Sequence, residues 1–78
     1  MRKFQAEFGV NDTVYIIRFD YGQFVAQLGT VVGVYFTFDN TTYMVDTVDA
    51  TNWYYASDVF KTQEDVLEEC RIRNHEEE

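Results

Sequence analysis

The residues that could perform chemistry are few and far apart in this chain. His75 is the only histidine and is followed by three glutamates, Cys70 is the only cysteine, and Ser57 is the only serine. A catalytic nucleophile needs a neighbouring base, and none of these residues has one nearby in the sequence. The P-loop, Gly-x-Ser-x-Gly and His-Glu-x-x-His motifs are absent. The sequence therefore predicts a protein that is not an enzyme.

Carboxylates are numerous, but their spacing is not that of a metal site. A calcium loop needs alternating oxygen donors and a glycine, whereas the clustered acidic residues here are the pairs 64–65 and 68–69 and the run 76–78. One cysteine and one histidine are too few for a zinc site. We expect no metal and no cofactor, and we interpret these carboxylates as a solvated surface.

The chain is strongly acidic. Its 78 residues carry 14 acidic and 6 basic side chains, for a net charge of −8, and Arg18 is the only cation between residues 4 and 60. Proteins bind phosphates by neutralising them with Lys and Arg, so direct nucleic-acid binding is disfavoured. Attraction to an anionic membrane surface is disfavoured for the same reason.

No apolar run is long enough to cross a bilayer, which takes about 18 residues or more. The first residues lack the apolar segment that is typical of a signal peptide. A lone cysteine also fits a reducing compartment. We therefore expect no membrane association and a cytoplasmic location.

The elements that must position any functional side chain are mainly strands. Residues 4–60 are rich in Val, Ile, Thr, Tyr and Phe, which favour β-structure. Turn residues divide this stretch, and residues 57–60 have the pattern of one helical turn. The sequence predicts a mostly β fold, a small bent barrel of about five antiparallel strands closed by one C-terminal α-helix. The expected strands are residues 4–8, 13–19, 24–38, 41–48 and 53–56.

The expected strand at residues 24–38 has an unusual length. Its even-numbered positions are apolar with one exception, so we expect that face to point to the core. A flat strand of this length would span about 50 Å, which exceeds a domain of this size. It must therefore bend, and Gly29 and Gly33 are the expected places.

The C-terminal part has the pattern of a helix over residues 63–73. Thr62 is the expected N-cap, with Asp65 three positions later. A helix this short is not stable alone, so its apolar face must pack on the barrel. Residues 74–78 are expected to form a frayed acidic tail, which leaves one domain over residues 1–73. The residues expected on the packed face are Val66, Leu67 and Cys70.

Four motifs follow one another in a recognisable order: NDTVYII at 11–17, GTVVGV at 29–34, YMV at 43–45 and YYASDVFKTQE at 54–64. Their order over residues 8–70 resembles that of small SH3-like barrel proteins encoded by bacteriophages and bacteria. The resemblance implies an SH3-like fold and a phage origin, and it brings no catalytic residues. Asn11 departs from the pattern, since those proteins often carry glycine there.

Two kinds of side chain remain as candidates for partner binding. In a strand, Trp53 and Tyr55 share one face and Tyr54 takes the other, and exposed large rings are typical of binding hot spots and peptide grooves. Carboxylates near the turns and on the helix would create a negative field. The candidate residues are Tyr21, Asp39, Asp46, Asp49, Trp53, Tyr55, Asp58, Glu64 and Glu68.

We interpret the chain as a non-enzymatic protein-binding module, a small phage accessory or host-takeover protein. Its expected partner is a basic host protein that meets the acidic and aromatic surface. One alternative is an acidic mimic of nucleic acid that inhibits a host nucleic-acid-binding protein. Another is a structural or oligomerising subunit, since an exposed edge strand with large rings invites pairing.

Overall fold

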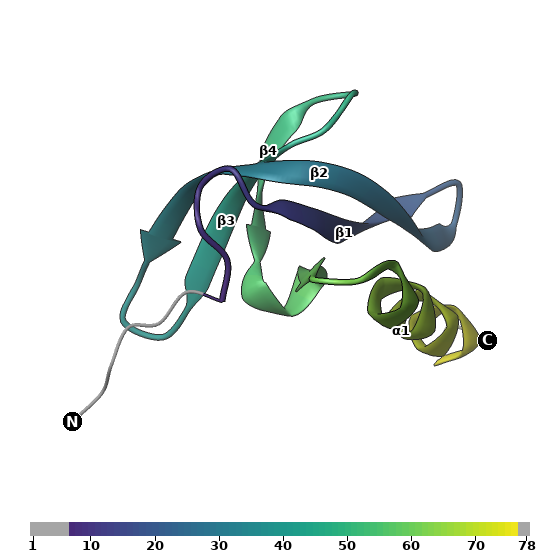
Figure 1. Cartoon of the computed structure of the whole chain (residues 1–78). Coiled ribbons are helices and arrows are strands. Elements are labelled where there is room, and N and C mark those ends of the chain that lie inside the picture. Colours follow the sequence, from purple (N-terminus) through teal and green to yellow (C-terminus); the bar gives the residue numbers. More distant parts are fainter. Residues whose placement is uncertain (1–6, 77–78) are drawn as a thin grey trace.

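Five antiparallel strands and a C-terminal helix make up the computed structural model, which describes residues 7–76 (Figure 1). The strands lie in one strongly bent sheet in the order β4-β3-β2-β1-β5. The predicted fold class, a small bent β-barrel with a closing helix, is confirmed. The elements are β1 (Thr13–Asp20), β2 (Gln23–Phe36), β3 (Thr41–Asp46), β4 (Thr51–Tyr55), a 3-10 turn (Ala56–Asp58), β5 (Val59–Phe60) and α1 (Gln63–Glu76).

Four of the expected strands correspond to β1–β4, but β5 was not expected from the sequence. Residues 4–6 of the strand expected at 4–8 lie outside the described residues, and Phe8 is buried in the core without belonging to a strand. The expected helical turn at 57–60 begins one residue earlier and ends at Asp58. That shift frees Val59–Phe60 to pair with β1 and buries Val59 in the core.

A bulge in β2 changes which side chains face the core. Val31 pairs with Val45, but the next paired residue of β2 is Gly33, so Val32 is an extra residue. Positions that face the main core are therefore odd-numbered before the bulge and even-numbered after it. At the start of β2 the even-numbered Phe24 and Ala26 face the second core, beneath α1. Val31 is fully buried and Val34 packs against the same cluster. The prediction that even positions face the core throughout is wrong, and Leu28, Val32, Phe36 and Phe38 are exposed.

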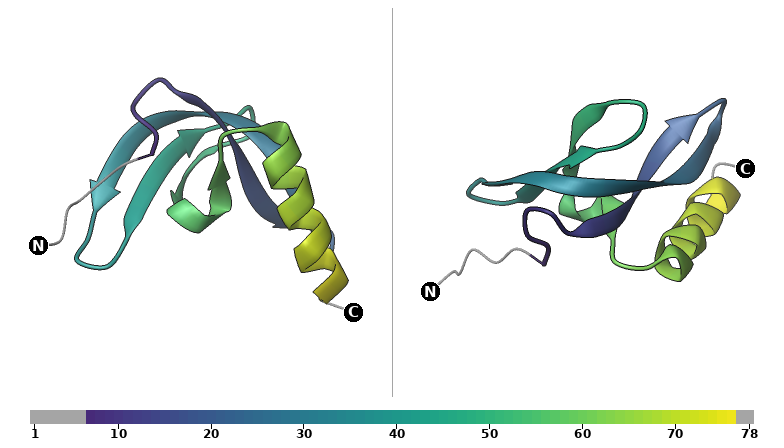
Figure 2. Two further views of the ribbon diagram at one scale, coloured as in Figure 1. Left: turned by 60° about the horizontal axis from the view of Figure 1, so that its bottom comes forward. Right: turned by 45° about the horizontal axis from the view of Figure 1, so that its top comes forward.

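Both faces of β1 are covered, as its apolar residues on both sides predicted. Val14 and Ile16 belong to the main core between the strands. Ile17 points the other way and packs with Val66 and Cys70 of α1. The helix therefore covers the end of the sheet near the β1–β2 turn. It does not cover the β2–β3 turn, which is at the other end of the sheet (Figure 2).

Two helix predictions need correction. The helix begins as predicted, with the backbone N–H of Asp65 donating to the Thr62 hydroxyl at 3.1 Å. It continues through Glu76, however, and residues 74–76 are not a frayed tail; residues 77–78 lie outside the described residues. Leu67 is half exposed, because a residue next to Val66 points about 100° away around the helix.

Asn74 explains why the helix extends further. Its amide accepts a hydrogen bond from the Phe24 N–H at 2.7 Å and donates one to the Phe24 carbonyl at 3.0 Å. Phe24 pairs with Phe19 on one side of β2, and the Asn74 side chain occupies the other side as a strand would. One side chain thus fixes the end of α1 to the start of β2.

We expect Asn74→Ala to lower the free energy of unfolding by about 1–3 kcal/mol, because it removes two hydrogen bonds and leaves two backbone groups unpaired. Urea denaturation followed by circular dichroism measures the loss. Leu67→Ala, on the exposed side of the same helix, is the control and should change stability by less than about 0.5 kcal/mol. Equal effects of the two substitutions would contradict the role given to Asn74.

Within residues 7–76, no helix has both the length and the apolar character needed to cross a membrane.

Candidate functional site

The outer face of β3 and β4 carries exposed rings. Tyr54 pairs with buried Tyr43 and packs against the main core. Strand alternation then turns the neighbours of Tyr54 outward, and the exposed fractions of Trp53 and Tyr55 are 51% and 60%. The predicted alternation of these three aromatic residues is confirmed, with Tyr54 as the inward one.

Tyr35 of β2 completes this surface. It pairs with Thr42 of β3, and its ring meets the Trp53 ring edge to face, with 6.0 Å between the centroids. The rings border a shallow groove of about 570 Å³. We call it the aromatic groove, and its lining residues are Tyr35, Thr37, Asn40, Thr42, Trp53, Tyr54 and Tyr55.

Local sequence explains how the rings come together. The turn between β2 and β3 is closed by Thr37, whose N–H donates to the Asn40 carbonyl at 2.8 Å and whose hydroxyl accepts from the Asn40 N–H. This turn sets the register that brings Tyr35 opposite Thr42. Gly33 lies beneath the indole, where an added Cβ would stand 4.0 Å from Trp53 Cη2. Gly33 has no side chain, so it leaves this side of the Trp53 ring uncovered.

The aromatic groove has no charged lining residue, and carboxylates lie at its two ends. Asp39 borders an adjoining hollow that shares Asn40 and Tyr55 with the groove. Asp46 lies on the same outer face beyond Trp53, and it accepts a hydrogen bond from the Thr51 hydroxyl at 2.6 Å. The structure thus brings four of the predicted site residues to one face, namely Asp39, Asp46, Trp53 and Tyr55.

The remaining predicted site residues lie elsewhere. Tyr21 is almost fully exposed, in the turn that precedes β2, at the opposite end of this strand from Tyr35. Asp58 forms an ion pair with Arg73 at 2.9 Å. Glu68 pairs with Arg71, and hydrogen bonding to that guanidinium lowers the pKa of the Glu68 carboxyl. Glu64 is exposed on the first turn of α1. These residues are therefore not among those that line the aromatic groove or the hollow beside it.

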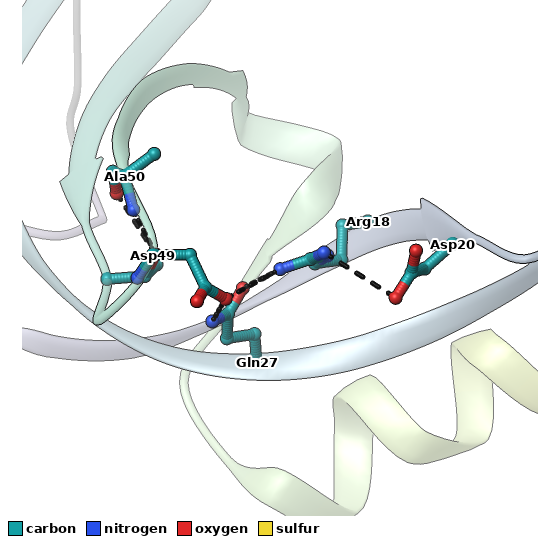
Figure 3. A network of polar contacts seen from close by, with 6 residues as sticks. Arg18, Asp20, Gln27, Asp49 and Ala50 are labelled. Carbon is teal, nitrogen blue, oxygen red and sulfur yellow. Dashed lines mark hydrogen bonds and ion pairs between the residues drawn. The ribbon is translucent and has the colours of Figure 1, made fainter.

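Asp49 belongs to a polar network that holds the β3–β4 turn against β1 and β2 (Figure 3). Arg18 donates to Gln27 at 2.8 Å and to Asp49 at 3.0 Å, and Gln27 donates to the same Asp49 oxygen at 2.9 Å. Asp20 lies 3.5 Å from the other end of the Arg18 guanidinium. The residue pattern around Asp49 does not reveal this structural role, and the available signal is that Arg18 is a lone cation in a long stretch whose other charges are acidic.

This network predicts a specific pH dependence. Hydrogen bonds from Gln27 and then Arg18 hold the pKa of the Asp49 carboxyl below its ordinary value of 3.8. A carboxyl with a lowered pKa in the folded state stabilises the fold above its unfolded-state pKa, and this contribution disappears as pH falls through the folded-state pKa. Asp49→Asn should therefore be less stable than wild type at neutral pH, and this difference should shrink below about pH 4. Urea denaturation across that range measures it, and a difference that stays constant to pH 2 would contradict the assignment.

The residues first considered for chemistry are separate from one another. Cys70 is buried against Ile17 and Val66, and burial raises the pKa of its thiol. His75 is exposed on the last turn of α1, and Ser57 is in the 3-10 turn. In the part of the chain that the structure describes, no three His, Cys, Asp or Glu side chains are grouped as a metal site.

Comparison with models of known families, with curated proteins and with solved structures finds no match to this chain. The resemblance to SH3-like phage proteins stays a prediction from the sequence. The function is therefore argued from the aromatic groove and its surroundings.

Proposed function

We propose that the protein is a non-enzymatic protein-binding module and that the aromatic groove is its binding surface. The observation that carries the proposal is the position of Tyr35, Trp53 and Tyr55 side by side on an open face. A chain of 78 residues has few apolar side chains to spare for its core. Rings kept outside such a core are available to a partner, and Trp and Tyr are the residues most enriched at binding hot spots.

The size of the groove determines how much it contributes to the free energy of binding. Large rings bury about 150–250 Å² each, and these three are 51–60% exposed. Covering them removes about 300 Å² from water, which is worth about 7 kcal/mol at 25 cal/mol per Å². Association itself costs roughly 4–15 kcal/mol. The rings can thus anchor a partner, and stable binding needs further contacts beside them.

Charge favours a basic partner. The chain has a net charge of −8, and the groove has no cation among its lining residues. Arg18, Arg71 and Arg73 each pair with carboxylates of the chain itself. A lysine or arginine of the partner would lie over the ring faces, an interaction worth about 0.5–2 kcal/mol.

The same observations give less support to the other functions. Bases of a single strand could stack on the rings, but the groove offers no cation to neutralise their phosphates. A mimic of nucleic acid needs its carboxylates on one face. Asp39 and Asp49, however, belong to two different turns, which lie at opposite ends of β3. From the sequence resemblance we further propose that the chain is phage-encoded and that it acts on a host protein in the host cytoplasm.

Selection of a random peptide library on the immobilised protein tests the proposal. We expect enriched peptides that contain arginine or lysine and that do not bind the Trp53→Ala variant. Peptides that bind both proteins equally would place the binding surface elsewhere. A labelled oligothymidylate should show no change in fluorescence anisotropy at low salt, and saturable binding of it would overturn the assignment to protein binding.

A further inference from the structure

The strand that carries Trp53 and Tyr55 is at the edge of the sheet. β4 pairs with β3 on one side, and for residues 7–76 the structure records no backbone hydrogen bond on its other side. Edge strands are usually protected by lysine, proline or a bulge. The β4 sequence TNWYY has neither a charge nor a proline, and its pairing with β3 is regular. This edge therefore has the features of one that can accept another strand.

The register determines which backbone groups point outward from β4. The Thr47 N–H donates to the Ala50 carbonyl at 2.9 Å, so these two residues are a hydrogen-bonded pair that closes the β3–β4 turn. Hydrogen-bonded and non-hydrogen-bonded pairs then alternate along an antiparallel ladder. Asn52 and Tyr54 direct their backbone groups to β3. The backbone groups that face the free edge are the N–H and C=O of Thr51 and Trp53 and the N–H of Tyr55. The Tyr55 carbonyl begins the 3-10 turn.

Two of the residues that offer free backbone groups, Trp53 and Tyr55, are thus also residues whose rings border the groove. A strand added beside β4 would lie about 4.8 Å away and would form hydrogen bonds with Trp53 and Tyr55. Its alternate side chains would then stand next to those two rings, as cross-strand neighbours do. Main-chain hydrogen bonds would supply the further contacts that the groove needs, and the rings would supply the selectivity.

We propose that the partner binds as an extended basic segment added to the free edge of β4, with arginine or lysine at alternate positions over the aromatic groove. This inference rests on the proposed function and adds the binding mode. Asp46 lies on the outer face at one end of the added strand, beside Thr51. A basic side chain at that end would meet its carboxylate.

Charge favours a basic segment over a second copy of the chain as the strand added to β4. Two copies paired through β4 would each bring a net charge of −8, and like charge opposes association. A cationic strand does not meet this repulsion, so the charge of the chain favours it.

A blocked peptide of alternating arginine and valine is the probe, titrated into the full-length protein and followed by backbone amide NMR. We expect saturable shifts at Thr51, Trp53 and Tyr55 and slower hydrogen exchange at their amides. The matched peptide of alternating glutamate and valine should bind at least about tenfold more weakly. No saturable shift with the arginine peptide, or equal affinity for both peptides, would overturn the inference.

N-methylation of the probe tests the backbone pairing directly. An added strand donates to β4 from every second residue, so methylating one alternate set should weaken binding at least about tenfold, the loss of two or more hydrogen bonds. Methylating the other set should change affinity less than twofold. If both sets bind as well as the unmodified peptide, the partner is not an added strand.

A variant pair tests the same contact from the protein side. Thr51→Val and Thr51→Pro both lose the hydroxyl that bonds Asp46, but only proline also loses the outward N–H. An edge position tolerates proline, and we expect Thr51→Pro to bind the probe about fivefold more weakly than Thr51→Val. Equal affinity of two folded variants would contradict the pairing, and the methylated peptides decide the question if the proline variant does not fold.

Two further outcomes separate this inference from the proposed function. If Trp53→Ala abolishes probe binding but N-methylation has no effect, strand addition is wrong and the groove remains the binding surface. If Trp53→Ala has no effect, the groove itself is wrong. Sedimentation of the free protein as a dimer that Thr51→Pro dissociates would assign the β4 edge to a second copy instead.

Discussion

Gly29→Ala is expected to lower the free energy of unfolding by about 3 kcal/mol or more, whereas Gly33→Ala should cost less than about 1 kcal/mol. An alanine Cβ at position 29 would stand 2.4 Å from Val45 Cγ1 and 3.1 Å from the Asp46 carbonyl oxygen. Val45 is fully buried, so it has little room to move aside. Adding volume to a packed core costs about 1–3 kcal/mol and sometimes more, and a contact with rigid backbone favours the upper part of that range.

Gly33 is the matched control because it is a glycine of the same strand. A Cβ there would stand 3.5 Å from the Met44 Cβ, an ordinary contact. Replacing glycine also lowers the entropy of the unfolded chain, which favours folding by about 0.4–1 kcal/mol. A domain of this size is expected to have roughly 4–12 kcal/mol of stability in total. The loss at Gly29 is therefore a large fraction of it.

Thermal unfolding followed by circular dichroism compares the two variants. A loss of 3 kcal/mol corresponds to a drop in Tm of about 12–24 °C, and Gly33→Ala should stay within about 5 °C of wild type. Similar Tm values for the two variants would mean that β3 does not approach β2 as closely at Gly29 as the structure has it.

The bend in β2 shows what a sequence pattern can and cannot predict. The length of the apolar alternation in 24–38 correctly required a bend, and the glycines placed it near Gly33, where the register shift occurs. Alternation alone contains no sign of an inserted residue, because Val32 is as apolar as its neighbours. The change of the core-facing side from Val31 to Val34 depends on the pairing with β3, which local sequence does not determine.

The short strand β5 was missed for a related reason. Two residues are too few to show a period, and Val59–Phe60 becomes a strand only through its pairing with Tyr15 and Ile16. Such a contact joins residues more than forty positions apart. Composition predicts that strands exist, while long-range pairing decides where the shortest one lies.

In the candidate site too, features that depend on local sequence were predictable and features that depend on long-range contacts were not. The exposure of Trp53 and Tyr55 was predictable because it depends on alternation within one strand. The grouping of the carboxylates was not, because two of them, Asp49 and Asp58, are held by arginines distant in the sequence. Asp49 meets Arg18 across 31 residues, and Asp58 meets Arg73 across 15. The sequence therefore shows where the acidic residues are in the chain, but the fold determines whether each carboxylate is available to a partner.

Trp53→Ala is expected to weaken binding of the selected peptides about 30-fold or more, the equivalent of about 2 kcal/mol that defines a hot spot. The indole is the largest ring of the groove, and it contacts the Tyr35 ring edge to face. Removing it takes away its own contact area and also the neighbour that holds the Tyr35 ring in place. Isothermal titration calorimetry with the selected peptides measures the loss.

Tyr21→Ala is the control for this experiment because Tyr21 is an even more exposed ring, 97% accessible, outside the groove. If exposed aromatic area alone attracted the peptides, the two substitutions would have similar effects. We expect Tyr21→Ala to leave the affinity within about twofold. Trp53 is half covered by its neighbours, so its removal also costs some stability, and urea denaturation must show that the variant is folded at the temperature of the titration. A folded Trp53→Ala variant with wild-type affinity would leave the protein-binding proposal without its principal anchor, because no other described ring of the groove joins β2 to the edge strand β4.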